Sequence, residues 1–422
     1  MSLSELMQDL QASVQTVVNL EGKLKDEKLI NALKNVLKTA KIGVTEETGK
    51  ALHRLDESKP SIDTVKELIQ GIPDAMSCTN GSYLLPIQLA VLASVKYVPI
   101  LAKEGTRHNV GGRGMRGGLL VEFPELVGDI SNTLQLISHA GYPSDPIPFD
   151  TDFLDVIKEL RKDNLFLKKD IKEHKLLYCS IHPNAKLRFE YLADWDPDCL
   201  MTCTYDDDMS LSHALFLHKT GYYATGIEKF TIFLQNSLKH YPQYLGFLFQ
   251  EDSEWKTAYE RAVDMFGIDE TFKVIQELIP TDTSLPILHR VMKYSPRCFN
   301  DFSTRYPSAL YLRDENARSF IQAQLAEGKK SFASDAYFFL RLSDDEIAEV
   351  DPVTKQYPFL TAATGQWGGN LSTTYFLLSK NPSLLERYRE EATQQAMEEQ
   401  EAEMRKRERD GDDDDEEKEE EE

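Results

Sequence analysis

The stretch Phe302-Ser-Thr-Arg-Tyr-Pro307-Ser-Ala-Leu310 contains the pattern that decides the fold of this protein. Apolar residues at helical spacing lead up to a proline, which has no N–H to donate to the preceding turn, so a helix must end just before it. The apolar residue three positions beyond the proline, here Leu310, can fold back onto the core and fix the exit of the chain. Similar phrases surround Pro73, Pro197, Pro242 and Pro382.

A second phrase opens the other helix of each unit. Pro86, Pro286 and Pro358 each precede an apolar stretch, at what we predict to be the first helical position, where the missing N–H costs nothing. The anchor positions of this phrase and of its weaker copies are residues 53, 88, 213, 260, 289, 322 and 360. Apart from one gap of 125 residues, they recur every 29 to 47 residues. Such a period predicts an α-solenoid of antiparallel helix pairs over residues 49–386.

The long gap between the anchors at 88 and 213 contains a glycine-rich stretch. Periodicity fails over residues 106–175, where we expect a special loop or an insertion. Elsewhere, second helices show apolar stripes of helical period, as in Ile62, Val65 and Ile69. Strand-type alternation is not sustained anywhere, so we predict an all-α fold without a β-sheet core.

The two ends of the chain differ from this middle part. Residues 1–48 carry apolar stripes that predict a helical segment capping the core, which we favour over a coiled-coil dimerisation arm because the heptads are too few. Residues 387–409 are rich in Glu, Gln, Ala and Arg and predict a charged helix. Residues 410–422 contain eleven carboxylates and one lysine, a net charge of -10, and predict a disordered acidic tail.

Composition narrows the possible partners and compartments. The chain has 422 residues and a net charge of -22, so -12 remains when the tail is left out. An acidic body gives no electrostatic support for direct nucleic-acid or membrane binding. Five scattered cysteines do not resemble a disulfide framework, and neither a leader nor a long apolar run is apparent. We therefore expect a soluble intracellular protein, cytoplasmic or nuclear.

Two phrases resemble a known repeat. Leu84-Leu-Pro-Ile-Gln-Leu-Ala90 and Tyr357-Pro-Phe-Leu-Thr-Ala-Ala363 resemble the Thr-Pro-Leu-His-x-Ala signature that opens an ankyrin repeat. Val65-Lys-Glu-Leu-Ile-Gln-Gly71 and Val98-Pro-Ile-Leu-Ala-Lys-Glu-Gly105 resemble the second helix of that repeat. Divergent ankyrin-like proteins of diatoms and related algae are also similar in sequence to residues 305–314, 349–354, 357–363 and 370–384.

The resemblance covers residues 49–386 and implies a helix-pair solenoid that binds proteins and has no catalytic residues. The chain departs from the pattern in two ways. The signature histidine is present only at His53, His213 and His289. The turn before the first helix is rarely recognisable, and its best candidate, Asn80-Gly81, is two residues too far from Pro86. We therefore expect the binding finger of ordinary ankyrin repeats to be missing or altered.

The glycine-rich stretch matches a dinucleotide-binding fingerprint by spacing alone. Gly112-x-Gly114-x-x-Gly117 would need a preceding strand and a carboxylate about twenty residues further on, and the sequence offers neither. We interpret the loop 111–118 as a connector. An anion-binding loop that uses Arg113 and Arg116 is the alternative.

One set of cysteine and histidine residues partly matches the spacing of a metal site. Cys199, Cys203, His213 and His218 resemble a zinc finger, but nine residues separate the two halves where about twelve are expected. We favour structural roles for all four. Asp206-Asp-Asp208 precedes a helix start and is interpreted as a loop that complements the helix dipole, with a partner-contacting tip as the alternative.

Motifs of covalent catalysis, phosphate binding and metalloproteases are missing from the sequence. We therefore predict no catalytic, cofactor-binding or metal-binding residues and no cofactor. The predicted function is a non-catalytic protein–protein interaction scaffold. The alternative is an acidic-tail chaperone or chromatin-type factor that binds basic proteins.

Overall fold

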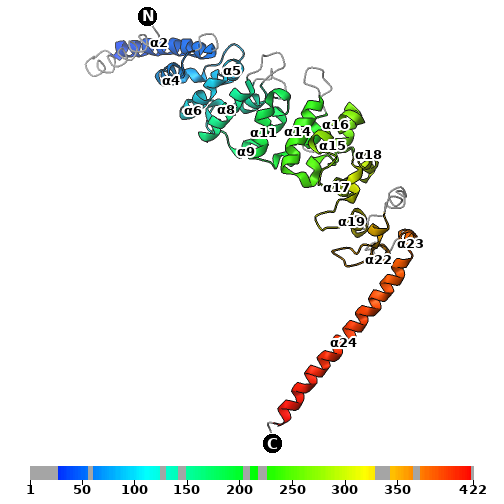
Figure 1. Ribbon diagram of the computed structural model, residues 1–422. Helices are drawn as coiled ribbons and strands as arrows, with labels where there is room; N and C mark the ends of the chain where they lie inside the picture. The colour runs from blue at the N-terminus through cyan, green and yellow to red at the C-terminus, as the bar shows by residue number, and fades with distance from the viewer. Residues whose placement is uncertain are drawn as a thin grey trace. The chain divides into compact units, whose positions relative to one another are not determined.

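The computed structural model describes residues 27–55, 60–123, 130–140, 149–202, 210–216, 226–327, 343–364 and 371–419. Within these ranges all regular structure is helical (Figure 1). Two isolated bridges, Glu122 to Asn132 and Glu251 to Thr257, are the only β-type pairings there. The all-α prediction is therefore confirmed for this part of the chain. Among the same residues, no helix combines the length and apolar character that crossing a membrane requires.

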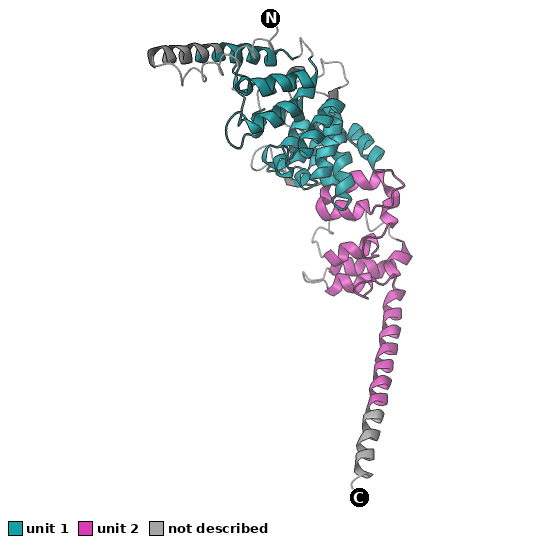
Figure 2. Ribbon diagram, turned by 90° about the vertical axis from the view of Figure 1, so that its left-hand side faces the viewer, with its two compact units in different colours: residues 1–278 teal, residues 279–422 magenta. Residues whose placement is uncertain are grey.

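The chain divides into two compact units, residues 1–278 and 279–422 (Figure 2). The helices of unit 1 are α2 (Glu27–His53), α4 (Ile62–Gly71), α5 (Pro86–Ala93), α6 (Val98–Arg107), α7 (Thr133–His139), α8 (Phe149–Lys162), α9 (Lys168–Glu173), α10 (Leu176–Ser180), α11 (Lys186–Trp195), α12 (Cys199–Thr202), α13 (Leu211–Ala214), α14 (Gly226–His240), α15 (Ala258–Phe266) and α16 (Ile268–Leu278). Those of unit 2 are α17 (Ile287–Tyr294), α18 (Phe299–Arg305), α19 (Phe320–Glu327), α21 (Asp344–Ala348), α22 (Pro358–Thr364), α23 (Leu371–Lys380) and α24 (Ser383–Glu419).

Proline ends the helices as the sequence predicts. Each of the five prolines stands two residues beyond the last residue of a helix: α4 before Pro73, α11 before Pro197, α14 before Pro242, α18 before Pro307 and α23 before Pro382. Three of these prolines start a 3₁₀ helix: Pro73–Ser77, Pro242–Phe247 and Pro307–Tyr311. A missing N–H is harmless at such a start, so one proline both stops one helix and opens a short turn.

The predicted fold-back residue is correct only in part. Three positions beyond the proline, Met76, Leu200 and Leu245 are buried. Leu310 is only half-buried and Leu385 is 38% exposed. Beyond Pro307 and Pro382 the buried residue is instead the second one, Ala309 and Leu384 respectively. Side chains three apart eclipse one another in a 3₁₀ helix, so Leu310 lies on the same side as the exposed Pro307.

The opening phrase is placed correctly for most anchors. Residues 88, 213, 260, 289, 322 and 360 are each the third residue of a helix. Pro86 and Pro358 are first residues as predicted, whereas Pro286 stands one residue before α17. His53 is the exception and corrects the prediction, because it lies in the last turn of α2. No proline interrupts the 27 residues of that helix, which therefore runs through the predicted boundary at residue 48.

The C-terminal helix is longer than predicted. α24 begins at Ser383 and continues to Glu419, past the boundary at residue 409 beyond which the sequence predicts disorder. The extension contains Gly411 and five aspartates, which are poor helix formers, so intrinsic propensity does not account for it. One predicted i,i+4 ion pair is present, Arg405 to Glu401 at 3.4 Å. The first N-terminal stripe, Leu3 to Val17, lies outside the described residues.

Helix pairs pack through large aromatic side chains. Tyr259 of α15 and Phe272 of α16 meet edge to face, with their ring centroids 5.7 Å apart, and both are almost fully buried. Burying a side chain of this size stabilises the fold by about 1.5–3 kcal/mol. In unit 2, Phe302 and Tyr306 stack at the end of α18, and the Tyr306 hydroxyl donates to the carbonyl of Ile279 at 2.8 Å. Burial raises the pKa of that phenol.

Candidate functional site

A turn of one kind precedes four of the helices whose third residue is an anchor position of the sequence repeat, α5, α15, α19 and α22. We call it the recurring turn, and its first residues are Asn80, Asp252, Asp314 and Asp351. In the first three cases the helix begins six residues later, and after Asp351 it begins seven residues later. The turn therefore begins six or seven residues before the helix that follows it.

The side chain of the first residue holds the recurring turn together. The Asn80 Oδ1 accepts hydrogen bonds from the backbone N–H groups two and four residues further on, at 3.0 and 2.9 Å. The carboxylates of Asp252 and Asp314 do the same, at 2.8–3.0 Å. The Asp351 carboxylate accepts from Val353 at 2.8 Å. A short polar side chain that bonds its own backbone in this way favours a turn over a helix or strand.

The backbone of the recurring turn is strained at one position. Tyr83, Trp255, Ala317 and Lys355 have φ values of 62°, 61°, 59° and 59°. This is the left-handed region, where a residue with a Cβ is disfavoured by about 1–2 kcal/mol and glycine is the usual choice. Two of the four are large aromatic residues whose side chains point into solvent, since Tyr83 is 75% and Trp255 is 73% exposed.

Sequence reasoning missed three of these turns and misjudged the fourth. Asn80 stands six residues before Pro86, the same interval as for Asp252 and Asp314 before their helices. The apparent excess of two residues is therefore the ordinary spacing in this chain. A search for an Asx residue six or seven positions before a helix start would have found all four turns, whereas a search for Asn-Gly finds only Asn80.

In several helices, the side chain of the third residue forms hydrogen bonds both to the start of its own helix and to a distant loop. In α5 the Gln88 Oε1 accepts from the N–H of Leu85 at 2.8 Å, while its Nε2 donates to the carbonyl of Val121 at 3.3 Å. Gln135 in α7 and Gln322 in α19 repeat both contacts. Each amide thus caps its own helix and holds a loop that follows 27 to 39 residues later.

A histidine plays the same part in α13. The His213 Nδ1 lies 2.7 Å from the hydroxyl of Ser210, and its Nε2 lies 3.2 Å from the carbonyl of Lys256. Because the carbonyl can only accept, Nε2 carries the proton and Nδ1 accepts. Burial lowers the pKa of His213, which favours this neutral form. A glutamine amide offers the same pair, one acceptor and one donor, so Gln88, Gln135 and Gln322 can make the kind of contacts that His213 makes.

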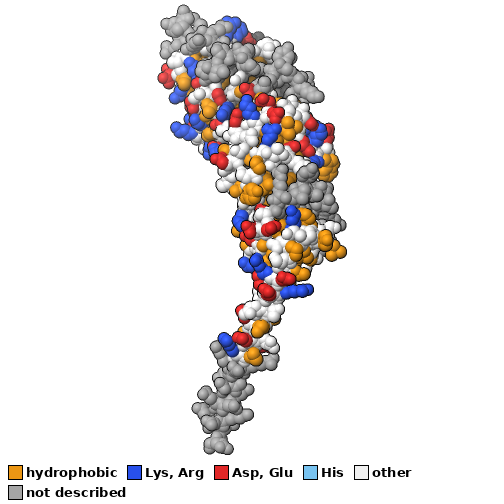
Figure 3. Space-filling view, turned by 45° about the vertical axis from the view of Figure 1, so that its right-hand side comes forward, with side chains coloured by type: hydrophobic (Ala, Val, Ile, Leu, Met, Phe, Trp, Pro, Cys, Tyr) orange, Lys and Arg blue, Asp and Glu red, His pale blue; other side chains and the backbone are white. Residues whose placement is uncertain are grey.

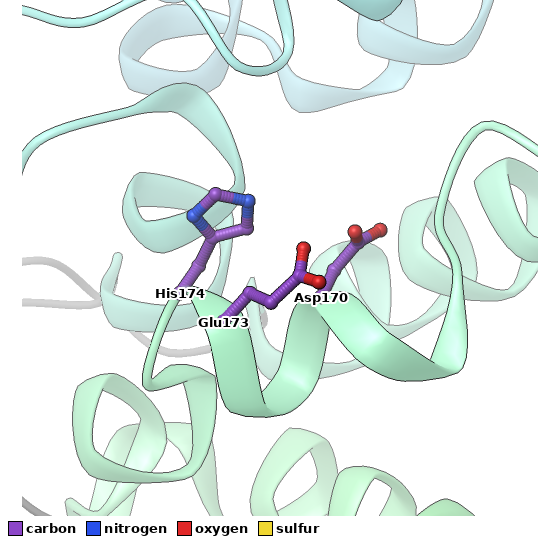
Figure 4. A group of neighbouring side chains, drawn as sticks. All are labelled: Asp170, Glu173 and His174. Carbon is purple, nitrogen blue, oxygen red and sulfur yellow. The ribbon is translucent and has the colours of Figure 1, made fainter.

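One group of side chains, on α9 and at the residue directly after it, has the composition of a metal site (Figure 4). Asp170, Glu173 and His174 each offer a ligand atom, and these atoms lie within 4.8 Å of one another. The Asp170 carboxylate is fully buried, and its Oδ2 accepts from the N–H of Leu167 at 2.7 Å. The same oxygen pairs with the guanidinium of Arg116. This oxygen is therefore already paired with a cation.

The His174 ring has also used its lone pair. The Asn132 Oδ1 accepts from the N–H of Gln135 at 3.0 Å, which directs the Asn132 amide N–H₂ toward His174 Nδ1 at 3.2 Å. Nδ1 is thus an acceptor, and Nε2 carries the proton. Burial lowers the pKa of His174. The second Asp170 oxygen, Oδ1, is buried without a hydrogen-bond partner. Because Oδ2 and His174 Nδ1 already have partners from α7 and from the glycine-rich loop, we interpret this group as a structural junction.

The glycine-rich loop is fastened in its second half. Arg116 pairs with the buried Asp170, so this arginine is not available for the anion-binding alternative. Gly117 has a φ of 68°, and a Cβ at this position would lie 2.1 Å from the carbonyl oxygen of Ala102. Gly117 is therefore required for close contact with α6. The segment that precedes the loop is α6, a helix and not a strand.

The zinc-like constellation is described only in part. Cys203 and His218 lie outside the described residues, as do Asp206 to Asp208. Cys199 is buried, and its thiol lies 3.1 Å from the carboxylate of Asp196. His213 has the two partners given above. Both described members thus make contacts that fit the structural roles predicted for them.

Sequence analysis gave no sign of Arg188, the largest fully buried side chain among the described residues. Its Nε donates to the Asp150 carboxylate at 2.8 Å, and its two terminal nitrogens donate to four carbonyl oxygens, those of Ile137, Ser138, Ala140 and Asn184, at 2.6 to 3.3 Å. Three of these carbonyls belong to the end of α7 or follow it directly, where a cation complements the helix dipole. Burial, together with the Arg188 charge, lowers the pKa of the neighbouring His182 to about 3.

Comparisons with known proteins give no assignment: no family model, curated protein or solved structure matches the chain. What bears on function is therefore its own surface. Exposed hydrophobic side chains are interspersed with charged ones on the face that Figure 3 shows. Besides Tyr83 and Trp255 in unit 1, Tyr311, Leu371 and Tyr375 in unit 2 are each at least 69% exposed.

Proposed function

We propose that the protein is a non-catalytic scaffold for protein–protein interaction, built from ankyrin-like helix pairs, and that it acts in the cytoplasm or nucleus. The observation that carries this proposal is the recurring turn with its exposed aromatic side chains, Tyr83 and Trp255. Tyrosine and tryptophan supply large contact areas at low cost in side-chain entropy, which is why they dominate protein interfaces.

The turns provide a rigid base for such contacts. Asn80 and Asp252 lock each turn through backbone hydrogen bonds, so the aromatic side chains lose little freedom on binding. Strain is also retained at these positions, although glycine would relieve it. Persistent strain at an exposed residue points to a role outside the fold itself.

A site-specific photo-crosslinker tests the proposal. We would place it at position 83 or 255 in the full-length protein inside cells, and at position 244 as a control. Tyr244 is an exposed aromatic residue of unit 1 that lies outside the recurring turns. The expected result is one protein crosslinked from both 83 and 255 but not from 244. Equal labelling from all three positions, or none from the two turns, would refute the role of the turns.

The acidic C-terminus supports a second candidate function, a chaperone or chromatin-type factor for basic proteins. Residues 410–422 carry a net charge of -10, and α24 extends into this segment as far as Glu419. Carboxylates displayed along a helix attract lysine-rich surfaces, and added salt screens that attraction. Deleting residues 410–422 should abolish salt-sensitive binding of a lysine-rich histone. Unchanged binding would leave the segment without this role.

A further inference from the structure

The loop between α6 and α7 places two arginines in nearly the same sequence context. Residues 111–118 read Gly-Gly-Arg-Gly-Met-Arg-Gly-Gly, so that Arg113 stands between two glycines and Arg116 precedes two. The structure treats the two residues very differently. This contrast provides a comparison within a single loop.

Arg113 lies at the open end of the loop. Residues 111 to 115 are all exposed, and the neighbouring Gly112 and Gly114 have φ values of 106° and 88°. A Cβ added at either glycine would meet no atom within 4 Å, so both flanks of Arg113 face open space. Among the residues that the structure describes, its guanidinium has neither an ion pair nor a hydrogen bond.

Arg116 lies only three residues further on but is enclosed. Its side chain is 17% exposed and pairs with the buried Asp170 carboxylate, and it donates to the carbonyl of Leu165 at 3.3 Å. The adjacent Gly117 is buried against α6. An enzyme could reach this guanidinium only after local opening of the loop.

We propose that Arg113 is a modification site, the substrate of an arginine-methylating enzyme, and that the fold protects Arg116 from the same enzyme. Such an enzyme must enclose a whole guanidinium and part of its stem in a narrow pocket. Glycines on both sides of Arg113 leave no side chain to obstruct that approach, and the space around both glycines is open. The proposal is independent of the function proposed above.

The reaction is a methyl transfer from a sulfonium donor. A terminal nitrogen of Arg113 attacks the methyl carbon, an N–C bond forms, and the C–S bond breaks with its electron pair passing to sulfur. The donor leaves as a thioether, and one N–H proton passes to a base of the enzyme. The product keeps its positive charge but loses a hydrogen-bond donor. The modification would therefore alter hydrogen bonding by this loop without changing the net charge of the chain.

The test uses the full-length folded protein, a purified arginine methyltransferase and an isotopically labelled sulfonium methyl donor, with peptide mass spectrometry as the readout. A synthetic peptide of residues 106–120, in which neither arginine is enclosed, shows that the enzyme accepts both positions. On the folded protein we expect label at Arg113, with Arg116 labelled at least about tenfold less, because its modification requires local opening. Arg113→Lys should remove the label at position 113, leave Arg116 at its low level and leave the circular dichroism spectrum unchanged.

Two outcomes would overturn the proposal. The first is a folded protein that remains unlabelled at Arg113 while the peptide is methylated. The second is equal labelling of Arg113 and Arg116 on the folded protein, since this would show that the enclosure of Arg116 gives no protection. The Arg113→Lys variant separates specific labelling from background, because any label that it retains must lie elsewhere.

Discussion

Replacing Arg188 by methionine should destabilise unit 1 more than any other single change considered for this protein. Methionine preserves most of the apolar stem but removes every donor. The change leaves four carbonyl oxygens without their guanidinium donor, those of Ile137, Ser138, Ala140 and Asn184. It also removes the charged partner of the Asp150 carboxylate.

The expected loss follows from the geometry. Breaking a buried ion pair from one side costs about 3–5 kcal/mol. Asp150 keeps the N–H of Leu187 as a donor at 2.7 Å, and its side chain is 14% exposed, so its charge can still be solvated. Most of the loss then comes from the carbonyl oxygens, whose desolvation is no longer compensated. We therefore expect the lower part of the range, about 3–4 kcal/mol.

Urea titration read by amide hydrogen exchange and mass spectrometry measures this loss region by region. Peptides from α7, α8 and α11 should exchange through an opening that is easier by the stated amount, whereas peptides from unit 2 serve as the internal reference. Arg161→Met is the matched control. Arg161 is exposed and lies over the ring of Trp195 at 4.0 Å, which predicts a loss of about 1 kcal/mol or less. A loss below about 1 kcal/mol for Arg188→Met would refute the assignment of Arg188 as the centre of this junction.

Three further predictions concern the recurring features. Gln88→Leu should lower the stability of unit 1 by about 1–3 kcal/mol in the same assay, because the N–H of Leu85 and the carbonyl of Val121 lose their hydrogen-bond partner. Gln88→His should restore part of that stability. Equal losses in both variants would show that these two hydrogen bonds do not stabilise the unit. Tyr83→Gly should raise stability by up to about 1–2 kcal/mol in thermal unfolding, because glycine adopts the left-handed backbone without strain. It should also weaken crosslinking from position 255. A destabilised variant would show that Tyr83 is not strained in the folded protein. Burial and the hydrogen bond to Asp198 raise the pKa of Tyr241 to about 12. The contribution of this phenol to the free energy of unfolding is therefore complete below pH 10 and is lost as the pH rises toward 12. Tyr241→Phe should remove this part of the alkaline loss of stability, and an unchanged pH profile would contradict the prediction.

The sequence by itself determined where helices end and which residue is third in the next one. Proline acts through its own ring and its missing N–H, so Pro73 or Pro307 stops a helix whatever lies around it. The same local chemistry made positions 88, 260, 289 and 322 recognisable before any contact was known. It failed at His53, where nothing local interrupts the helix.

Only the tertiary structure decided what those positions do. Gln88 and Gln322 act on loops that are 33 and 27 residues away, and Arg188 reaches back 51 residues to the carbonyl of Ile137. The contrast between Arg113 and Arg116 has the same origin, because Asp170, 54 residues from Arg116, encloses one arginine and leaves the other open. Contacts of this kind depend on the positions of backbone and side-chain groups that are distant in the sequence. Two nearly identical local contexts carry no information about those positions.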